Sequence, residues 1–559
     1  MQEIYRSKPM TDRVLKTDSI SFSAIPGQSK LFTRYQEEPL SLRKFYPSVI
    51  ESHTQAAARI PEVLSNYKTD RSQLCDALAE INTIYGAGPK TFANIDLLRD
   101  ENTVAIVTGQ QAGLFTGPLY SIYKALSAVK MAECLRGRGF KAVPVFWAAT
   151  EDHDFEEISS TVVLGKDHEL RKLQTSENLR PDDKPVGSII LDRSISVTIN
   201  ELFDALPETE FSGQLRKTVE AAYEEGYSFG DAFGIFLARV LGDYGLIILD
   251  PLNERLKKLA APIYAEAVEK SSEIVAALIE RSADLERNDY HAQVLVNEDY
   301  FPFFWHSDDG NRKPLKKIAD GLFRLKNEKT QFTTAQLAAA ASSEPQRFSP
   351  GVMLRPVVQD YLLPTLCYFG GGAEIAYFAQ NSVVYQILGR PVTPILHRQS
   401  ITIVEARQTR IFAKYGLTFT DLFPGFEKLL PRIVEKAIDP QTGEIFVEIE
   451  EKISKELNRL DQTLSLIDPT LAENLATRHK KILYHIAGLR KKFHRVQIEK
   501  NDIVNRQIRS SFSALLPNGH LQERVLNVTS FLDRYGVYFI DWVYDSIDLD
   551  DKGHRIIYL

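Results

Sequence analysis

Cysteine and long hydrophobic runs are scarce in this 559-residue sequence. The three cysteines, Cys75, Cys134 and Cys367, lie far apart and form no CxxC pair. This spacing excludes a disulfide framework and a cysteine-ligated zinc site and suits a reducing compartment, so we expect a cytoplasmic protein. No run approaches the roughly 18–20 apolar residues that span a membrane. The N-terminus, MQEIYRSKPMTDR, has no apolar segment of the signal-peptide kind. We therefore expect neither a secretion signal nor a membrane partner.

The chain also lacks an excess of positive charge, because its net charge is −7 at pH 7. This balance argues against generic nucleic-acid binding, and we expect no nucleic-acid partner. Hydrophobic residues make up 44% and charged residues 25%, which is ordinary for a globular protein. A chain of this length is too long to fold around a single hydrophobic core, so about two to four domains are expected.

Residues 103–157 carry the clearest fold signal. An apolar, β-branched run at 104–107 leads into a turn with three glycines, and apolar residues at spacings of three and four then indicate a helix. A second apolar run, 143–149, ends in the polar cluster Glu151-Asp152-His153-Asp154. Strand, loop, helix and strand form a βαβ unit, in which ligands bind at the carboxyl ends of the strands. Both this cluster and Gln110-Gln111 lie at those ends.

The glycine turn has two interpretations. Gly109, Gly113 and Gly117 would let backbone N–H groups approach an anion, and the following helix would offer its N-terminus to a phosphate or carboxylate. The spacing matches neither GxGxxG nor GxxxxGK[ST], so a purely structural turn is equally open. Lys124, two turns into the helix, either supports a phosphate or is a solvated surface residue.

The acidic cluster at 151–154 also has two interpretations. Carboxylates beside a histidine can bind Mg²⁺, orient an ammonium group or act as acid and base. The alternative is a helix N-cap in a solvated turn. Trp147 just upstream favours a site, since a tryptophan side chain can exclude water from a pocket and define its shape.

A third polar group lies within residues 349–380, SPGVMLRPVVQDYLLPTLCYFGGGAEIAYFAQ. Three consecutive glycines open a helix there and fit close backbone approach to a ligand, with Glu374 in the first turn. A flexible turn with ordinary capping is the alternative. Polar residues clustered in an otherwise apolar segment favour a site, and they include Arg355, Gln359, Asp360 and Tyr377.

The pattern predicts an α/β fold with a Rossmann-like parallel sheet built from 103–108, 143–149, 245–250 and 392–397. A further strand-like run covers 186–191. Heptad-spaced apolar residues on both sides of Asp468-Pro469 predict an antiparallel coiled-coil hairpin. The expected segments are a core at 1–160, 229–262 and 348–438, connecting insertions at 161–228 and 263–347, a coiled-coil domain at 439–518, and a tail at 519–559 that docks on the core.

Three stretches carry a family resemblance: TGQQAGLFTGPLYSIYKA, VFWAATEDHDFEEI and LRPVVQDYLLPTLCYFGGGAEIAYFAQ. They closely resemble the BshC family of bacillithiol biosynthesis, the cysteine-adding enzymes of that pathway, and the resemblance covers essentially the whole chain. One departure is Ala373, where many relatives have proline in GGPxEIAY. This change loosens the turn but removes no functional group.

The resemblance implies a core like that of class I aminoacyl-tRNA synthetases, two connecting insertions and a coiled coil that forms a homodimer. The implied reaction adds cysteine to the amino group of glucosaminyl-malate. A free carboxylate needs activation to acylate an amine, so ATP or another nucleotide is expected, and Mg²⁺ remains an open alternative. The chain lacks the synthetase signatures HxGH and KMSKS, and Gln110-Gln111 would stand where the histidines would be. Another adenylate-forming or nucleotidyl-transferring enzyme, or a nucleotide-binding coiled-coil scaffold, therefore also stays open.

These arguments converge on one expected pocket. His153 is the candidate proton acceptor, because its unperturbed pKa is about 6.5. Arg355 would hold a malate or cysteine carboxylate through two hydrogen bonds. Catalytic roles are expected for Gln111, Asp152, His153 and Asp154, and substrate or nucleotide binding for Thr108, Gly109, Gln110, Gly113, Gly117, Tyr120, Lys124, Trp147, Glu151, Arg355, Gln359, Asp360, Gly371, Gly372, Glu374 and Tyr377.

Overall fold

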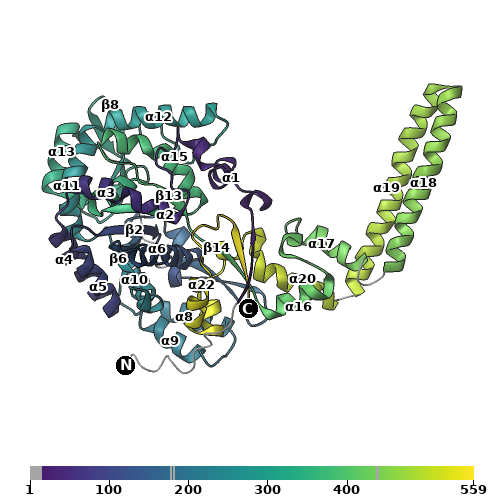
Figure 1. The fold of residues 1–559 in the computed structure, drawn as a ribbon, viewed down its shortest axis with the longest axis horizontal. Coiled ribbons are helices and arrows are strands. Elements are labelled where there is room, and N and C mark those ends of the chain that lie inside the picture. The colour runs from purple at the N-terminus through teal and green to yellow at the C-terminus, as the bar shows by residue number, and fades with distance from the viewer. Residues whose placement is uncertain (1–14, 177–178, 180–182, 436–439, 501) are drawn as a thin grey trace. The chain divides into compact units, whose positions relative to one another are not determined.

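The computed structural model describes residues 15–176, 179, 183–435, 440–500 and 502–559 (Figure 1). The chain forms two compact units. Unit 1 comprises Met1–Thr402 and Gln522–Ile557, and unit 2 comprises Ile403–Leu521 and Tyr558–Leu559. Unit 2 thus begins well before the predicted start of the coiled coil at 439. The finer division into seven segments stays a prediction.

A five-stranded parallel sheet forms the centre of unit 1. Its order is β13 (Ile395–His397), β12 (Thr365–Gly370), β2 (Val104–Gln110), β3 (Ala142–Ala148) and β6 (Ile247–Leu249). All four predicted strands are present and all neighbours are parallel, which confirms the Rossmann-like fold. β12, a six-residue strand that follows Pro364 and ends at Gly370, was not among the predicted strands. A strand buried on both faces shows no alternation of polar and apolar residues, so its pattern resembles any short apolar run.

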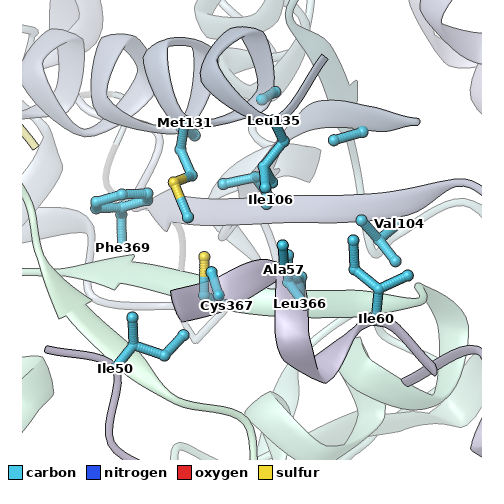
Figure 2. Close-up of a cluster of buried hydrophobic side chains, with 14 residues drawn as sticks. Ile50, Ala57, Ile60, Val104, Ile106, Met131, Leu135, Leu366, Cys367 and Phe369 are labelled. Carbon is cyan, nitrogen blue, oxygen red and sulfur yellow. The ribbon is translucent and has the colours of Figure 1, made fainter. Parts of the chain in front are cut away.

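Helices cover the sheet because each has an apolar face to bury. Met131 and Leu135 of α6 reach toward Ile106 of β2, while Ala57 and Ile60 approach from the short N-terminal helices (Figure 2). The helices that precede or follow the core strands are α1 (Lys30–Glu37), α2 (His53–Ala56), α3 (Ile60–Asn66), α4 (Arg71–Ile84), α5 (Pro89–Leu98), α6 (Tyr120–Gly137), α10 (Phe229–Val240), α11 (Glu254–Glu269), α14 (Arg355–Leu362) and α15 (Gly372–Ile387).

Two connecting segments interrupt the core. The first holds α7 (Phe155–Ile158), the antiparallel strands β4 (Ser160–Leu164) and β5 (Leu170–Gln174), α8 (Ile195–Ala205) and α9 (Ser212–Glu220). The second holds α12 (Ser271–Arg287), α13 (Thr334–Ser343) and an antiparallel sheet of β7 (Phe303–His306), β8 (Arg312–Ala319), β9 (Leu322–Leu325), β10 (Gln331–Thr333) and β11 (Phe348–Pro350). Residues of β7, β8 and β11 reach the candidate site described below.

The strand predicted at 186–191 is wrong. Val186–Ser188 is a 3-10 helix, and Ile190 makes only an isolated bridge to Ser228. The amides of Val186 and Gly187 donate instead to the carbonyls of Asp152 and Thr150, at 2.7 and 2.9 Å. A Cβ on Gly187 would lie 2.6 Å from Thr150 Cβ, so this tight approach requires glycine. The segment therefore braces the turn that follows β3 and does not extend a sheet.

Most of the C-terminal segment, Gln522–Ile557, belongs to unit 1. It contains α21 (Thr529–Tyr535), α22 (Tyr538–Asp545) and β15 (His554–Tyr558), and β15 joins β1 (Lys16–Ile20) and β14 (Ser400–Val404) in a three-stranded sheet. The Leu119 amide donates to the Leu526 carbonyl at 2.9 Å. Residues 526 and 527 also bridge to Val162 and Pro118. The segment is therefore part of the fold that supports the loop after β2.

Unit 2 is helical. It contains α16 (Ala406–Tyr415), α17 (Phe426–Ile433), α18 (Pro440–Ile467), α19 (Pro469–Lys500) and α20 (Asp502–Leu515). The predicted antiparallel hairpin is confirmed, because α18 and α19 pack along each other with their break at Asp468. The Asp468 carboxylate accepts a 2.8 Å hydrogen bond from the Thr470 amide and starts α19. Within the described part of the chain, no helix is long and apolar enough to cross a membrane.

Candidate functional site

Lys124 of α6 joins the ends of two core strands. Its Nζ donates to the Gly109 carbonyl and to Gln110 Oε1, both at 2.8 Å, and forms an ion pair with Glu374 at the start of α15. The lysine is 3% exposed, so it is not the solvated surface residue of one interpretation. Burial lowers the pKa of Lys124, while the pKa of Glu374 lies below its usual value because Lys124 offsets the effect of burial. Lys124 therefore fixes where Gln110 and Glu374 lie.

Glu374 is held by its own helix as well. It accepts hydrogen bonds at 2.7 Å from the Gly371 amide and from the Tyr368 hydroxyl, and the first of these caps α15. A Cβ on Gly370 would lie 2.8 Å from Ile395 Cδ1, and one on Gly372 would lie 3.3 Å from the Phe32 ring. Close packing thus accounts for glycine at 370 and leaves little room at 372, whereas a Cβ on Gly371 would make only ordinary contacts.

Arg355 opens α14 and is partly exposed. It donates at 3.1 Å to Gln359 Oε1 and to the Tyr377 hydroxyl. Its guanidinium carbon lies 5.9 Å from the Trp147 ring centre and 5.4 Å from that of Tyr368. Among the residues that the structure describes, no carboxylate lies within ion-pair distance of Arg355. The guanidinium is therefore oriented by neutral groups and keeps its charge available for an anion.

Gln359 and Asp360 support Arg355 from behind. Gln359 Nε2 donates to Asp360 Oδ1 at 3.1 Å, and the Tyr385 hydroxyl donates to Asp360 Oδ2 at 2.5 Å. Both Gln359 and Asp360 are buried, and burial raises the pKa of Asp360. Burial likewise raises the pKa of Tyr377 to about 12, so its hydroxyl stays protonated. Asp360 consequently positions the amide of Gln359 rather than facing a ligand itself.

The acidic cluster divides into three environments. Asp152 accepts a 2.7 Å hydrogen bond from Gln111 Nε2 and a 2.8 Å bond from the His153 amide. Glu151 is buried and pairs with Lys257 of α11 at 2.5 Å. Asp154 is exposed and caps α7, accepting from the Glu157 amide at 3.2 Å. The capping alternative thus describes Asp154, while Asp152 joins the end of β3 to the end of β2.

Sequence reasoning missed Lys257 and Arg312. Lys257 donates to the Phe348 carbonyl at 2.7 Å as well as pairing with Glu151. Arg312 of β8 reaches His153 Nδ1 at 2.8 Å. A charged residue on the apolar face of α11, beside Leu256 and Ala260, was a usable signal for Lys257. Arg312 lies in a basic strand, and nothing in the local pattern distinguishes it from its neighbours.

The glycine loop after β2 is buried and strained. Phe115, Thr116 and Gly117 all have positive φ, at 52°, 73° and 67°. The amides of Gly113, Phe115 and Gly117 donate within the protein, to the Gln111 carbonyl, the Tyr223 hydroxyl and the Leu114 carbonyl at 2.7–2.9 Å. These three amides are therefore already committed, which favours the structural interpretation of the loop.

Asn527 of the C-terminal segment holds this loop in place. Its side-chain amide donates to the carbonyls of Phe115 and Gly117, at 2.9 and 2.7 Å. Its own carbonyl oxygen accepts from the Thr529 amide at 2.9 Å and the Thr529 hydroxyl at 2.7 Å. The donor end of Asn527 is thereby fixed toward the loop that follows Gln110 and Gln111.

The remaining predicted residues take mainly supporting positions. The Thr108 hydroxyl donates to the Phe369 carbonyl at 2.8 Å and joins β2 to β12. A Cβ on Gly109 would lie 2.7 Å from the Trp147 carbonyl oxygen. The Tyr120 hydroxyl accepts a long 3.4 Å contact from Gln110 Nε2. In the described ranges, no three His, Cys, Asp or Glu side chains are placed to hold a metal ion.

The structure thus links most predicted residues into two networks at the carboxyl edge of the sheet. One network centres on Lys124, and the other joins Gln111, Asp152, His153 and Arg312. Arg355 packs against Tyr368, whose hydroxyl donates to Glu374 in the Lys124 network. Gln110 belongs to the first network and the adjacent Gln111 to the second, so the two networks meet at the end of β2.

Comparisons with known proteins agree over nearly the whole chain. Residues 15–399 match the family model described as "Bacillithiol biosynthesis BshC, N-terminal Rossmann-like domain", and residues 401–559 match its "C-terminal coiled-coil domain". Relatives named "Putative cysteine ligase BshC" include one from Koribacter versatilis, 32% identical over 97% of this chain and 99% of the relative. Another, from Solibacter usitatus, is 33% identical over 96% and 98%. A third, from Bacillus cytotoxicus, is 31% identical over 89% and 92%.

Proposed function

Because this chain belongs to the BshC family of bacillithiol biosynthesis, we propose that it joins the cysteine carboxyl group to the amino group of glucosaminyl-malate. The observation that best supports this proposal is Arg355. It is a preoriented guanidinium without a carboxylate partner in the described part of the chain, and both substrates carry carboxylates. Arg–carboxylate pairs form two parallel hydrogen bonds, which suits recognition of such a substrate.

The chemistry requires an activated acyl group. An amide forms when the amine attacks the carboxyl carbon, one carboxyl oxygen leaves and the amine loses a proton. The oxygen of a free carboxylate is a poor leaving group in water. We therefore propose ATP or another nucleotide as the activating substrate. The described residues offer no cluster of three metal ligands, and we propose that any Mg²⁺ enters with the nucleotide phosphates.

Charge divides the site into two halves that suit the two reactants. Lys124 and Arg355 face one carboxylate, Glu374, and leave excess positive charge for an anion. Asp152 is about one-third exposed and places a carboxylate at the end of β3, 3.7 Å from Arg312 Nη1. We therefore propose that Arg355 holds a substrate carboxylate and that Asp152, oriented by Gln111, receives the amine, with Asp154 at the exposed rim.

The direct test is to incubate the purified full chain with cysteine, glucosaminyl-malate and ATP and to follow the products by mass. We expect bacillithiol, together with AMP or ADP. A cell lacking the protein should lose bacillithiol and accumulate glucosaminyl-malate. Nucleotide turnover with no dependence on glucosaminyl-malate would instead favour another adenylate-forming enzyme. Nucleotide binding without any turnover would favour a scaffold.

Replacing Arg355 with lysine should weaken substrate binding selectively. Lysine keeps the charge but lacks the planar guanidinium that donates two parallel hydrogen bonds. Loss of one charge-assisted hydrogen bond costs about 1.5–3 kcal/mol. We expect kcat/KM to fall by roughly 10- to 100-fold, mainly through KM of one carboxylate substrate. Arg216→Lys is the matched control, since Arg216 also lies over an aromatic ring, 4.5 Å from Phe203, but outside the site. Equal kinetics for the two variants would remove Arg355 from substrate recognition.

The hairpin is proposed to join two copies of the chain. Residues at its heptad positions are strongly exposed in a single copy, including Ile449 at 40%, Leu460 at 44% and Leu489 at 61%. The rings of Phe446 and Phe493 lie 5.8 Å apart, so residues 447–492 can be replaced by a short glycine–serine turn that leaves α20 intact. We expect the full chain to sediment as a dimer and the shortened chain as a monomer. A shortened chain that still sediments as a dimer would place the interface elsewhere.

A further inference from the structure

Nδ1 of His153 faces a hydrogen-bond donor, whereas a general base needs a ring nitrogen whose lone pair is free. Arg312 Nη1 lies 2.8 Å from His153 Nδ1. A guanidinium stays protonated at every accessible pH and can only donate, so Nδ1 must accept and cannot carry a proton. We propose that Arg312 is a positioning residue that fixes His153 as the neutral imidazole with its proton on Nε2, so that His153 offers the site a hydrogen-bond donor.

Arg312 is held too firmly to turn away from this contact. Its Nε donates to Ser349 Oγ at 2.9 Å, and its guanidinium carbon lies 3.6 Å from the centre of the Phe304 ring. The residue is 7% exposed. Its strand pairs with β7, where Arg312 lies opposite His306. The Arg312 guanidinium is already held by the Phe304 ring and by Ser349. Binding His153 therefore costs it little additional conformational entropy.

The surrounding charges act on His153 in both directions. Asp152 Oδ1 lies 3.7 Å from His153 Nδ1 and also 3.7 Å from Arg312 Nη1, while Asp154 and Asp183 face the ring from farther away. Phe304 covers the ring, with centroids 5.6 Å apart. Burial and then Arg312 lower the pKa of His153, and the three aspartates oppose them. A second proton would add a cation beside Arg312, so the neutral ring is favoured.

This arrangement changes the role expected from the sequence. A ring whose Nδ1 lone pair is engaged and whose Nε2 bears hydrogen does not take a proton from an amine. It instead suits an oxygen that gains negative charge, such as the carbonyl oxygen of the acyl group under attack or an oxygen of its leaving group. This assignment of a reacting oxygen rests on the proposed ligase function, whereas the tautomer does not.

The tautomer can be measured without any activity. Histidine side chains of the full chain are labelled with ¹⁵N, and the His153 signals are identified by their loss in His153→Gln. We expect an unprotonated Nδ1 and a protonated Nε2 from pH 6 to 8. In Arg312→Met the ring should become protonated at higher pH than in the native chain, because one of the two effects that lower its pKa is removed while the aspartates remain. Arg347→Lys is the control, since Arg347 also lies beside a ring, 5.5 Å from Trp305, and forms no contact with His153.

Kinetics separate a donor from a base. A glutamine amide can reach the place of Nε2 and donate there, whereas asparagine reaches only the place of Nδ1. We expect His153→Gln to keep kcat within about tenfold and His153→Asn to lose about 10²–10³-fold, which is typical for loss of one such donor. Arg312→Met should shift the acid limb of the kcat/KM profile to higher pH, while Arg347→Lys leaves it in place.

Two outcomes would overturn the inference. A proton on Nδ1 in the native chain at pH 7 would contradict the proposed tautomer, whatever reaction the protein catalyses. Equal losses in His153→Gln and His153→Asn would contradict the donor role even with the tautomer confirmed. Failure of the ligase assay alone would leave the NMR result standing and would refute only the proposed reaction.

Discussion

Replacing Lys124 with methionine is expected to lower the free energy of unfolding of unit 1 by about 3–5 kcal/mol. Methionine fills similar space but leaves the Glu374 carboxylate buried without its cation. It also leaves the Gly109 carbonyl and Gln110 Oε1 without their shared donor. Denaturant unfolding followed by tryptophan fluorescence measures the change. Catalysis should fall as well, since Gln110 loses its fixed position.

The double variant K124M/E374Q separates charge burial from packing. A neutral glutamine removes the unpaired charge, so we expect the double variant to recover a large part of the stability lost in K124M but little activity. Lys130→Met is the control on the same helix, where Nζ lies 4.4 Å from the ring centre of Tyr544 in a partly exposed contact. That contact contributes about 0.5–1 kcal/mol. A similar small loss in K124M would show that the Lys124–Glu374 pair does not stabilise the site.

Replacing Glu523 with glutamine should have a comparable effect through a different buried cation. Both oxygens of Glu523 accept from Arg398, at 2.7 and 2.8 Å, and they also accept from the Ser400 hydroxyl and the Ile401 amide. Glutamine keeps the shape but leaves Arg398 buried without a counter-charge, which costs about 3–5 kcal/mol. Glu62→Gln is the control, because its 2.9 Å pair with Arg59 is largely exposed on the glutamate side and should contribute less than about 1 kcal/mol.

The same carboxylate makes stability depend on pH. Burial alone would raise its pKa, but Arg398 prevails and holds the pKa of Glu523 at about 2, below the ordinary value of 4.5. A depressed pKa in the folded chain means that the stabilisation is complete above pH 4.5 and disappears as pH falls toward 2. The native chain should therefore lose stability over this range more steeply than E523Q. Parallel pH profiles for the two proteins would contradict the assignment.

The sequence predicted the parts of the fold that depend on local pattern. The apolar runs that became β2, β3, β6 and β13 were visible because each is bounded by a helix pattern or by glycine and proline. The rule that parallel strands end at one edge then placed the polar clusters near each other. β12 is also bounded by proline and glycine, but it is buried on both faces, and its short apolar run could not be told from a buried helix segment. At 186–191 the first three residues form a 3-10 helix whose amides bond to the turn after β3.

The partners of the site residues could not be predicted in the same way. Lys257, Arg312 and Asn527 come from α11, β8 and the C-terminal segment. Only Lys257 carries a local signal, its charge on the apolar face of α11, and that signal does not identify its partner. Their roles depend on contacts between segments more than 100 residues apart. The glycine loop was ambiguous for a related reason, since glycine spacing alone does not say whether backbone amides point to a ligand or to the protein. His153 was assigned as a base from its ordinary pKa, before its neighbour Arg312 was known.

The hydrogen bonds from Asn527 to the loop after β2 have a consequence for how the protein is made. The ribosome releases that loop early, but Asn527, which holds it, is encoded after residues 403–521, the main part of unit 2. At about 5–20 residues per second, synthesis of the intervening 403–521 takes on the order of ten seconds. During that time the strained loop of the nascent chain lacks the hydrogen bonds from Asn527. A prematurely terminated product that lacks the last 40 residues or so would therefore contain every predicted catalytic side chain and still be inactive, so the cell makes no working enzyme until translation is almost complete.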